Sequence, residues 1–193
     1  MNGNIKNILN KKNKSKLVCL TAYSKNIASI LDNHCDIILV GDSLGSVLYN
    51  YKSTKEVTLD TMINHSKSVR LGVKKSLMVV DMPFNTYRNP KEALKNAKLV
   101  IKKTKCDAVK LEGGKKIISI VRKLVKNKIP VMGHLGILPQ TDKKFTFKGK
   151  KSFPLLNNWL KTKYQLWAML VFCLKQIKNS GLRERNKKKV KKY

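Results

Sequence analysis

Charged side chains follow three apolar, β-branched segments of the sequence, at the point where each segment ends. Asp42 and Ser43 follow the first segment, Asp81 ends the second, and Lys110 and Glu112 lie at the end of the third. Parallel α/β proteins keep their chemistry at the carboxyl ends of their strands. These residues supply three carboxylates, one hydroxyl and one ammonium group. A magnesium ion that holds an anionic substrate needs a set of groups of this kind.

Each of these residues also has a structural interpretation. An aspartate after a strand is most often a turn former, but Asp42 and Asp81 occupy equivalent places in successive units. Two aspartates at one edge repel each other unless a cation lies between them. Lys110 and Glu112 face the same side of a strand and could form a structural ion pair. Alternatively, Lys110 could neutralise a substrate carboxylate while Glu112 supports the metal or its water. Ser43 could donate to a substrate carboxylate or cap a turn.

The histidines and cysteines form no catalytic or metal-binding pattern with one another. His134 follows the last apolar segment and could be an acid–base group, a hydrogen-bond donor or a satisfied loop histidine. The four cysteines have no Cys-x-x-Cys spacing, so we expect no zinc site. Reduced thiols indicate the cytoplasm. The sequence also has no Ser-His-Asp arrangement and no phosphate-binding Gly-rich loop. Magnesium-assisted chemistry on a keto acid is therefore favoured over hydrolysis by a triad and over phosphoryl transfer.

Five short apolar segments, which we expect to be strands, alternate with four segments of helical spacing. The expected strands are residues 17–22, 36–41, 76–81, 108–111 and 129–132, and the expected helices lie near 24–31, 60–71, 89–101 and 115–126, with a loop from 42 to 51. This alternation predicts a parallel sheet, either doubly wound or in a (β/α)8 barrel. No Gly-x-Gly-x-x-Gly follows the first strand, and polar residues end strands two to five alike. We therefore favour an α/β barrel of the TIM type.

We expect this barrel to be incomplete, because a full one needs about 250 residues and the five units end near Pro139. The chain then divides into a polar N-terminal extension (1–16), a partial barrel domain (17–150) and a basic divergent tail (151–193). Residues 143–193 carry 16 basic residues and one acidic residue. A functional basic tail, a truncation or a shifted reading frame would each explain this change. An unpaired strand edge predicts self-association as a homo-oligomer or an aggregate.

The whole chain is strongly basic. It contains 42 Lys plus Arg residues against 11 Asp plus Glu, a formal charge of +31. Lysine far outnumbers arginine, and aromatic residues are not interleaved with the basic ones, so we interpret the charge as a compositional bias and expect no nucleic-acid partner. Residues 1–16 lack the apolar region of a signal peptide, and the longest apolar run, 166–174, is too short to span a bilayer. We therefore expect no membrane partner.

Several motifs, in collinear order over about residues 17–150, resemble the ketopantoate hydroxymethyltransferase (3-methyl-2-oxobutanoate hydroxymethyltransferase) family. A set of such motifs in order is far more specific than a single short pattern. The matching segments are Leu20–Tyr23, Asp36–Gly45, Val57–Asp60, Val80–Phe84, Ala108–Gly114 and Ile129–Gly136, continued by Pro139 and Gln140.

The resemblance implies a (β/α)8 barrel enzyme that uses a keto acid and a folate. Such an enzyme transfers a hydroxymethyl group from 5,10-methylenetetrahydrofolate to 3-methyl-2-oxobutanoate, which gives 2-dehydropantoate on the route to pantothenate and coenzyme A. The resemblance also implies that Asp42 and Asp81 bind Mg²⁺ with Glu112 beside or on the metal. The residues implied to contact the keto acid are Asp42, Ser43, Asp81 and Lys110. The metal would polarise the keto group while a base removes the proton at C3.

The catalytic base of this family is a glutamate at the end of a later strand. The only acidic residue after Asp142 is Glu184, which lies in a basic, polar segment. The base is therefore left unassigned. Three alternatives stay open: an inactive truncated copy, a basic protein whose tail binds nucleic acid, and another magnesium enzyme that cleaves carbon–carbon bonds of 2-oxo acids.

Overall fold

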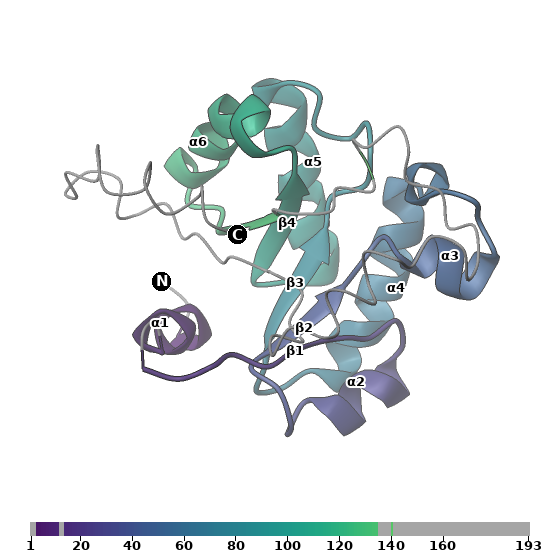
Figure 1. Cartoon of the computed structure of the whole chain (residues 1–193), viewed down its shortest axis with the longest axis vertical. Helices are drawn as coiled ribbons and strands as arrows, with labels where there is room; N and C mark the ends of the chain where they lie inside the picture. Colours follow the sequence, from purple (N-terminus) through teal and green to yellow (C-terminus); the bar gives the residue numbers. More distant parts are fainter. Residues whose placement is uncertain (1–2, 12–13, 135–139, 141–193) are drawn as a thin grey trace, which may run out of the picture.

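A computed structural model of the chain describes residues 3–11, 14–134 and 140. Its centre is a five-stranded parallel sheet in which each strand lies beside the next strand along the chain (Figure 1). The strands are β1 (Cys19–Thr21), β2 (Ile37–Val40), β3 (Leu77–Asp81), β4 (Ala108–Glu112) and β5 (Val131–His134). Each overlaps one of the apolar segments, so the predicted strand positions are confirmed.

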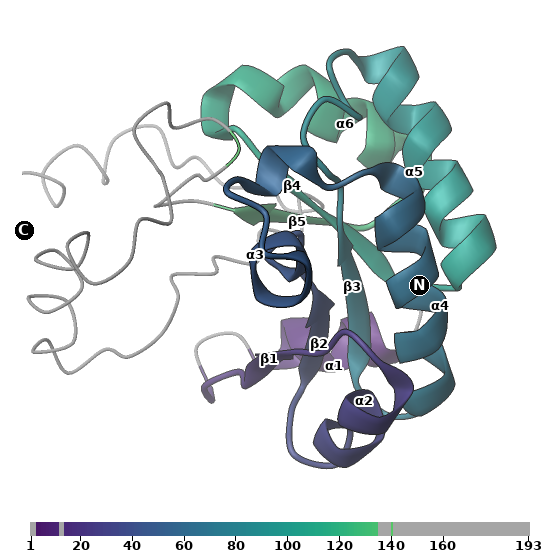
Figure 2. The same ribbon diagram turned by 90° about the vertical axis from the view of Figure 1, so that its right-hand side faces the viewer.

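Four helices cover the outer face of the sheet. They are α2 (Lys25–Leu31), α4 (Leu59–Gly72), α5 (Pro90–Thr104) and α6 (Ile118–Lys126). They follow one another side by side around the sheet (Figure 2), and each packs against the next. A doubly wound sheet reverses its strand order and carries helices on both faces. The sequential strand order and the ring of crossover helices are those of a (β/α)8 barrel, of which the described residues form an open part.

Polar side chains fix where two of these helices begin. The Asn89 side chain accepts hydrogen bonds from the backbone N–H groups of the first turn of α5, and Pro90 opens that helix. Proline is favoured at this position because the N–H that it lacks has no partner inside the helix. The hydroxyl of Thr58 accepts from the backbone of α4 in the same way. These caps place both helices at the start of their crossover to the next strand.

One part of the predicted organisation was wrong. Residues 42–51, expected as a loop, contain helix α3 (Leu44–Tyr49), and a short 3-10 helix, η1 (Thr54–Glu56), follows it. The helix buries Leu44 completely and ends at Asn50, which has a left-handed conformation. A Cβ atom at Gly45 would lie 2.6 Å from Val57 Cγ2. This glycine therefore serves close packing, although a glycine beside serines in the sequence is typical of a loop.

The apolar side chains form two cores, one on each face of the sheet. Alternate residues of β2 illustrate the division: Ile38 and Val40 pack under the outer helices, whereas Ile37 and Leu39 face the concave side. This arrangement explains why the strands are apolar without alternation, because both faces are covered. Another 3-10 helix, η2 (Gly114–Ile117), precedes α6. In the part of the chain that the structure describes, no helix has the length and apolarity needed to cross a bilayer.

The segment 1–16, expected as a polar extension, contains helix α1 (Gly3–Asn10). Ile5 and Ile8 of this helix are buried in the concave core with residues of β2, β3, β4 and β5. Figure 1 shows α1 on the side of the sheet away from α2, α4 and α5. Lys11, just after the helix, forms an ion pair with Asp36 at the start of β2. The segment is therefore held against the sheet by two apolar side chains, Ile5 and Ile8, although most of its residues are polar.

Candidate active site

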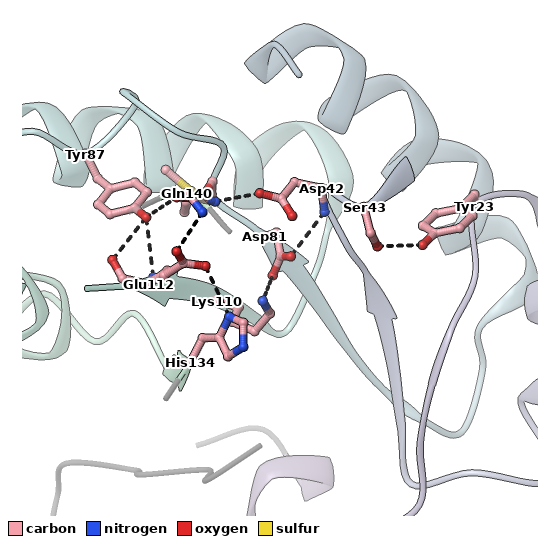
Figure 3. A network of polar contacts seen from close by, with 10 residues as sticks. Tyr23, Asp42, Ser43, Asp81, Tyr87, Lys110, Glu112, His134 and Gln140 are labelled. Atoms are coloured by element: carbon pink, nitrogen blue, oxygen red, sulfur yellow. Dashed lines mark hydrogen bonds and ion pairs between the residues drawn. The ribbon is translucent and has the colours of Figure 1, made fainter. Parts of the chain in front are cut away.

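The carboxyl ends of β2, β3, β4 and β5 bring the predicted site residues into one polar network (Figure 3). The strand register explains how. Asp81 on β3 is paired with Lys110 on β4, and Glu112 on β4 is paired with His134 on β5. Asp42 follows β2 after a single glycine and lies at the same edge. The structure therefore places all of these side chains at the end of the barrel where such folds bind their substrates.

Asp42, Asp81 and Lys110 form the centre of this network and are all buried. The backbone N–H of Asp42 donates to Asp81 Oδ2 at 3.1 Å, and Lys110 Nζ lies 2.9 Å from Asp81 Oδ1. Burial disfavours the charged amine, but the negative charge of Asp81, followed by those of Asp42 and Glu112, outweighs it and raises the pKa of Lys110. The ammonium group is therefore charged although it is buried.

Asp42 is placed unfavourably for a carboxylate. Burial first, and the neighbouring charge of Asp81 second, raise the pKa of Asp42 to about 7. The hydrogen bond from Gln140 and the charge of Lys110 act in the opposite direction but do not compensate. Of the two neighbouring aspartates, only Asp81 forms an ion pair with the ammonium group of Lys110. An added cation would relieve this imbalance.

Glu112 points toward β5 and the residues that follow it. Its Oε1 accepts a 2.7 Å hydrogen bond from the backbone N–H of Gln140, and its Oε2 lies 3.2 Å from His134 Nδ1. His134 therefore contacts a carboxylate of the predicted site. Figure 3 shows Glu112 between His134 and Gln140, with Lys110 beneath it.

Ser43 lies beside Tyr23, which follows β1, and not against the carboxylates (Figure 3). Its hydroxyl makes a 2.8 Å hydrogen bond with the hydroxyl of Tyr23. Ser43 occupies the N-cap position of α3 but makes no capping hydrogen bond. The cap that sequence reasoning offered as an alternative is therefore not formed by its side chain.

Two residues of the network were not singled out from the sequence. Gln140 Nε2 donates to Asp42 Oδ2 at 2.6 Å and to the carbonyl of Met82 at 3.1 Å. The hydroxyl of Tyr87 hydrogen-bonds both to Gln140 Oε1 and to the backbone of Glu112. Neither residue ends a described strand, so the spacing rule that found the carboxylates could not find them. The motif resemblance did extend to Gln140, which was the one available signal.

The donor atoms at this mouth suit a magnesium ion, although the three carboxylates do not form a cluster. Within the described residues, no group of three or more His, Cys, Asp or Glu side chains is close enough to hold a metal. The reason is visible in the pairings: Asp81 is held by Lys110, and Glu112 is turned toward Gln140 and His134. Asp42 and Asp81 are adjacent, and magnesium is commonly bound by one or two carboxylates together with substrate oxygens and water. The residues present therefore fit such an ion.

The strand order, the outer helices and the buried charged residues at the carboxyl ends of the strands define an α/β-barrel protein with a polar site at one end of the barrel. The particular family follows from the sequence match: residues 3–154 match the family described as ketopantoate hydroxymethyltransferase, and the chain belongs to it. It is 73% identical over 151 residues to the 3-methyl-2-oxobutanoate hydroxymethyltransferase of Pelagibacter ubique (strain HTCC1062), covering 78% of this chain and 59% of that protein. It is 54% identical over 125 residues to the same enzyme of Rhizobium etli, covering 64% of this chain and 46% of that protein.

These proportions mean that the chain spans about half the length of the curated relatives that it matches. The similar solved structures agree on the fold. A crystal structure of 2,3-dimethylmalate lyase, a PEP mutase/isocitrate lyase superfamily member, matches with a TM-score of 0.52 and 12% identity over 69% of this chain and 51% of that one. Oxaloacetate acetylhydrolase matches with a TM-score of 0.51 and 11% identity over 67% of this chain and 51% of that one. The predicted barrel type and its partial extent are therefore confirmed.

Proposed function

We propose that the chain supplies the metal- and keto-acid-binding part of a 3-methyl-2-oxobutanoate hydroxymethyltransferase. In this reaction a hydroxymethyl group passes from 5,10-methylenetetrahydrofolate to 3-methyl-2-oxobutanoate, which gives 2-dehydropantoate for pantothenate and coenzyme A synthesis. The observation that carries the proposal is the buried group of Asp42, Asp81 and Lys110 at the barrel mouth of a chain that belongs to this family. We place the reaction in the cytoplasm, where free thiols such as those of the described cysteines stay reduced.

In this proposal Asp42 and Asp81 hold Mg²⁺, and Glu112 lies beside the metal and orients its water. The bound ion would polarise the keto group of the substrate as a Lewis acid. The raised pKa of Asp42 supports the assignment, because a buried carboxyl group beside a second one is stabilised as an anion by a cation. Glu112 fits the supporting position because both of its oxygens already contact Gln140 or His134.

Lys110 and Ser43 complete the proposed keto-acid site. The Lys110 ammonium group is charged and lies at the same edge as the two aspartates, so it can neutralise the substrate carboxylate. Ser43 offers a hydroxyl that is already oriented by Tyr23 and can donate to a substrate oxygen while Tyr23 donates to it. These contacts would orient the C3 carbon of the keto acid for attack on the one-carbon donor.

None of the described residues is assigned as the base that removes the proton at C3. The described carboxylates at this mouth are Asp42, Asp81 and Glu112, and all three are already used in the proposed binding of the metal. A base must be an additional group within reach of the C3 proton. The contribution of the described residues is therefore binding and polarisation of the keto acid.

The test is calorimetric titration of the purified chain with 3-methyl-2-oxobutanoate, with and without Mg²⁺. We expect binding that requires the metal and that is lost in Lys110→Met and in Asp81→Asn. Lys102→Met, on helix α5 away from the site, is the matched control and should bind like the wild type. Incubation with 5,10-methylenetetrahydrofolate, followed by mass spectrometry for 2-dehydropantoate, measures turnover in parallel. Keto-acid binding that is unchanged without Mg²⁺ and unchanged in Lys110→Met would contradict the proposed site.

A further inference from the structure

Gln140 connects Asp42, a proposed metal ligand, with Glu112, the carboxylate that the proposed function places beside the metal. We propose that Gln140 is a positioning residue, which holds Asp42 and Glu112 in the orientation that the cation and the keto acid require. The inference rests on the proposed function, since it concerns the same site. Gln140 lies at the end of no described strand, and the proposed function gives it no contact with either substrate.

The contacts of Gln140 span three segments of the barrel mouth. Its side-chain Nε2 donates to Asp42 Oδ2 at 2.6 Å, and its backbone N–H donates to Glu112 Oε1 at 2.7 Å. The same Nε2 donates to the carbonyl of Met82, directly after β3, at 3.1 Å. Gln140 is only 4% exposed, so these hydrogen bonds form in a desolvated environment. A donor lost there leaves a buried acceptor unsatisfied, which is costly.

The orientation of the amide group is determined by its neighbours. Both partners of Nε2 are acceptors, a carboxylate and a carbonyl, so the amide cannot be reversed without placing its oxygen against them. On the other side, the Tyr87 hydroxyl donates to Gln140 Oε1 and accepts a hydrogen bond from the backbone N–H of Glu112 at 3.4 Å. Figure 3 shows Gln140 between Tyr87 and Asp42, above Glu112. Tyr87 therefore holds the amide with its donor side toward Asp42.

This arrangement determines which carboxylate oxygen of Asp42 is left for a ligand. Oδ2 is occupied by the Gln140 donor, whereas Oδ1 receives no hydrogen bond from any described residue. A carboxylate that is fixed at one oxygen presents the other in a defined direction, and supporting hydrogen bonds of this kind orient metal ligands. Asp42 would therefore offer Oδ1 to a cation, while Oδ2 stays hydrogen-bonded to Gln140.

The probe for this inference is Mn²⁺, whose binding to the full chain is measured by electron paramagnetic resonance without any turnover. In Gln140→Leu we expect Mn²⁺ to bind roughly 10- to 100-fold more weakly, the range seen when partners of metal ligands are removed. Water-proton relaxation should show more exchangeable water on the Mn²⁺ that remains bound, because Asp42 loses the hydrogen bond that fixes it, whereas the backbone N–H that binds Glu112 is kept. A role in folding alone would not change this hydration signal.

A second variant and a control keep the test decisive. Gln140→Met keeps a side chain of similar size but removes the amide donor to Asp42, so it should weaken Mn²⁺ binding as well. Asn96→Leu removes a comparable amide, which donates to the Thr86 carbonyl at 2.7 Å, and should bind Mn²⁺ like the wild type. Mn²⁺ affinity and hydration of both Gln140 variants within twofold of the wild type, with unchanged circular dichroism, would overturn the inference. A wild-type chain that binds Mn²⁺ without turnover would contradict the transferase activity alone.

Discussion

Asp81 and Lys110 are direct neighbours across strands β3 and β4, and their side chains form a 2.9 Å ion pair at the barrel mouth. Both residues are more than nine-tenths buried. A buried pair of this kind is strongly destabilised when one partner is removed, because the other charge is left without compensation. The pair is therefore part of the folded scaffold as well as of the proposed substrate site.

Replacement of this lysine should lower stability as well as binding. We expect Lys110→Met to reduce the free energy of unfolding by about 3–5 kcal/mol, since Asp81 would remain buried without its counter-charge. Urea denaturation followed by circular dichroism measures the change. The double variant Lys110→Met/Asp81→Asn removes both charges and should recover much of the loss. If the single and double variants were equally unstable, the ion pair would not be the cause.

The raised pKa of Asp42 predicts an unusual dependence of stability on pH. The folded-state pKa of about 7 lies above the ordinary value of 3.8, so the folded protein binds more protons than the unfolded chain between these values. The contribution of this group is fully present below about pH 3.8 and is lost as the pH rises through about 7. We expect the decline to approach at most about 1.4 kcal/mol per pH unit. Denaturation of wild type and Asp42→Asn at several pH values compares the slopes.

The same titration gives a separate prediction for the metal. If Mg²⁺ binds beside the Asp42 carboxylate, it stabilises the anion and should flatten the decline between pH 5 and pH 8. Chelation with EDTA should restore the slope. Identical curves with and without Mg²⁺ would place the ion elsewhere or show that it does not bind.

A close approach between two outer helices depends on Gly72. A Cβ atom at this position would lie 2.4 Å from the backbone oxygen of Lys25 at the start of α2. Gly72→Ala should therefore force α2 and α4 apart and cost about 1–3 kcal/mol, as overpacking does. Gly133→Ala is the matched control, because no described atom lies within 4 Å of the added carbon. Thermal unfolding of the two variants tests this difference.

Helix α1 should contribute measurably to stability despite its polar composition. Ile8 is 7% exposed and packs in the concave core, so Ile8→Ala should cost about 2–5 kcal/mol. Lys6→Ala, on an exposed position of the same helix, should have little effect. Equal losses of stability in the two variants would mean that burial of Ile8 is not what holds the segment in place.

We also propose that the chain associates with itself. Ile30 on α2 is 65% exposed and Leu71 is 68% exposed on α4, the helix that packs against α2, so large apolar side chains of two neighbouring outer helices face solvent. Sedimentation velocity should show species larger than the monomer. The double variant Ile30→Lys/Leu71→Lys should shift the distribution toward the monomer. A single monomeric species at all concentrations of the wild type would refute this proposal.

The strands and the acidic residues of the site could be predicted because they depend on local patterns. Apolar β-branched runs form buried parallel strands, and such strands bring their carboxyl ends to one edge, so Asp42, Asp81 and Glu112 could be expected together. Gln140 could not be expected there, because its place depends on where the chain returns after β5. Helix α3 was missed because it is only six residues long and contains a glycine that is selected by packing against Val57.

The sequential strand order also has a consequence for how the protein is made. Each strand pairs with the strand that precedes it in the chain, so its pairing partner has always been synthesised first. The strands that carry Asp81, Lys110 and Glu112 can therefore pair without waiting for any later part of the chain. The hydrogen bond between Gln140 and Asp42 joins residues that are far apart in the chain, so this part of the proposed cation site is completed only after β5 has been made.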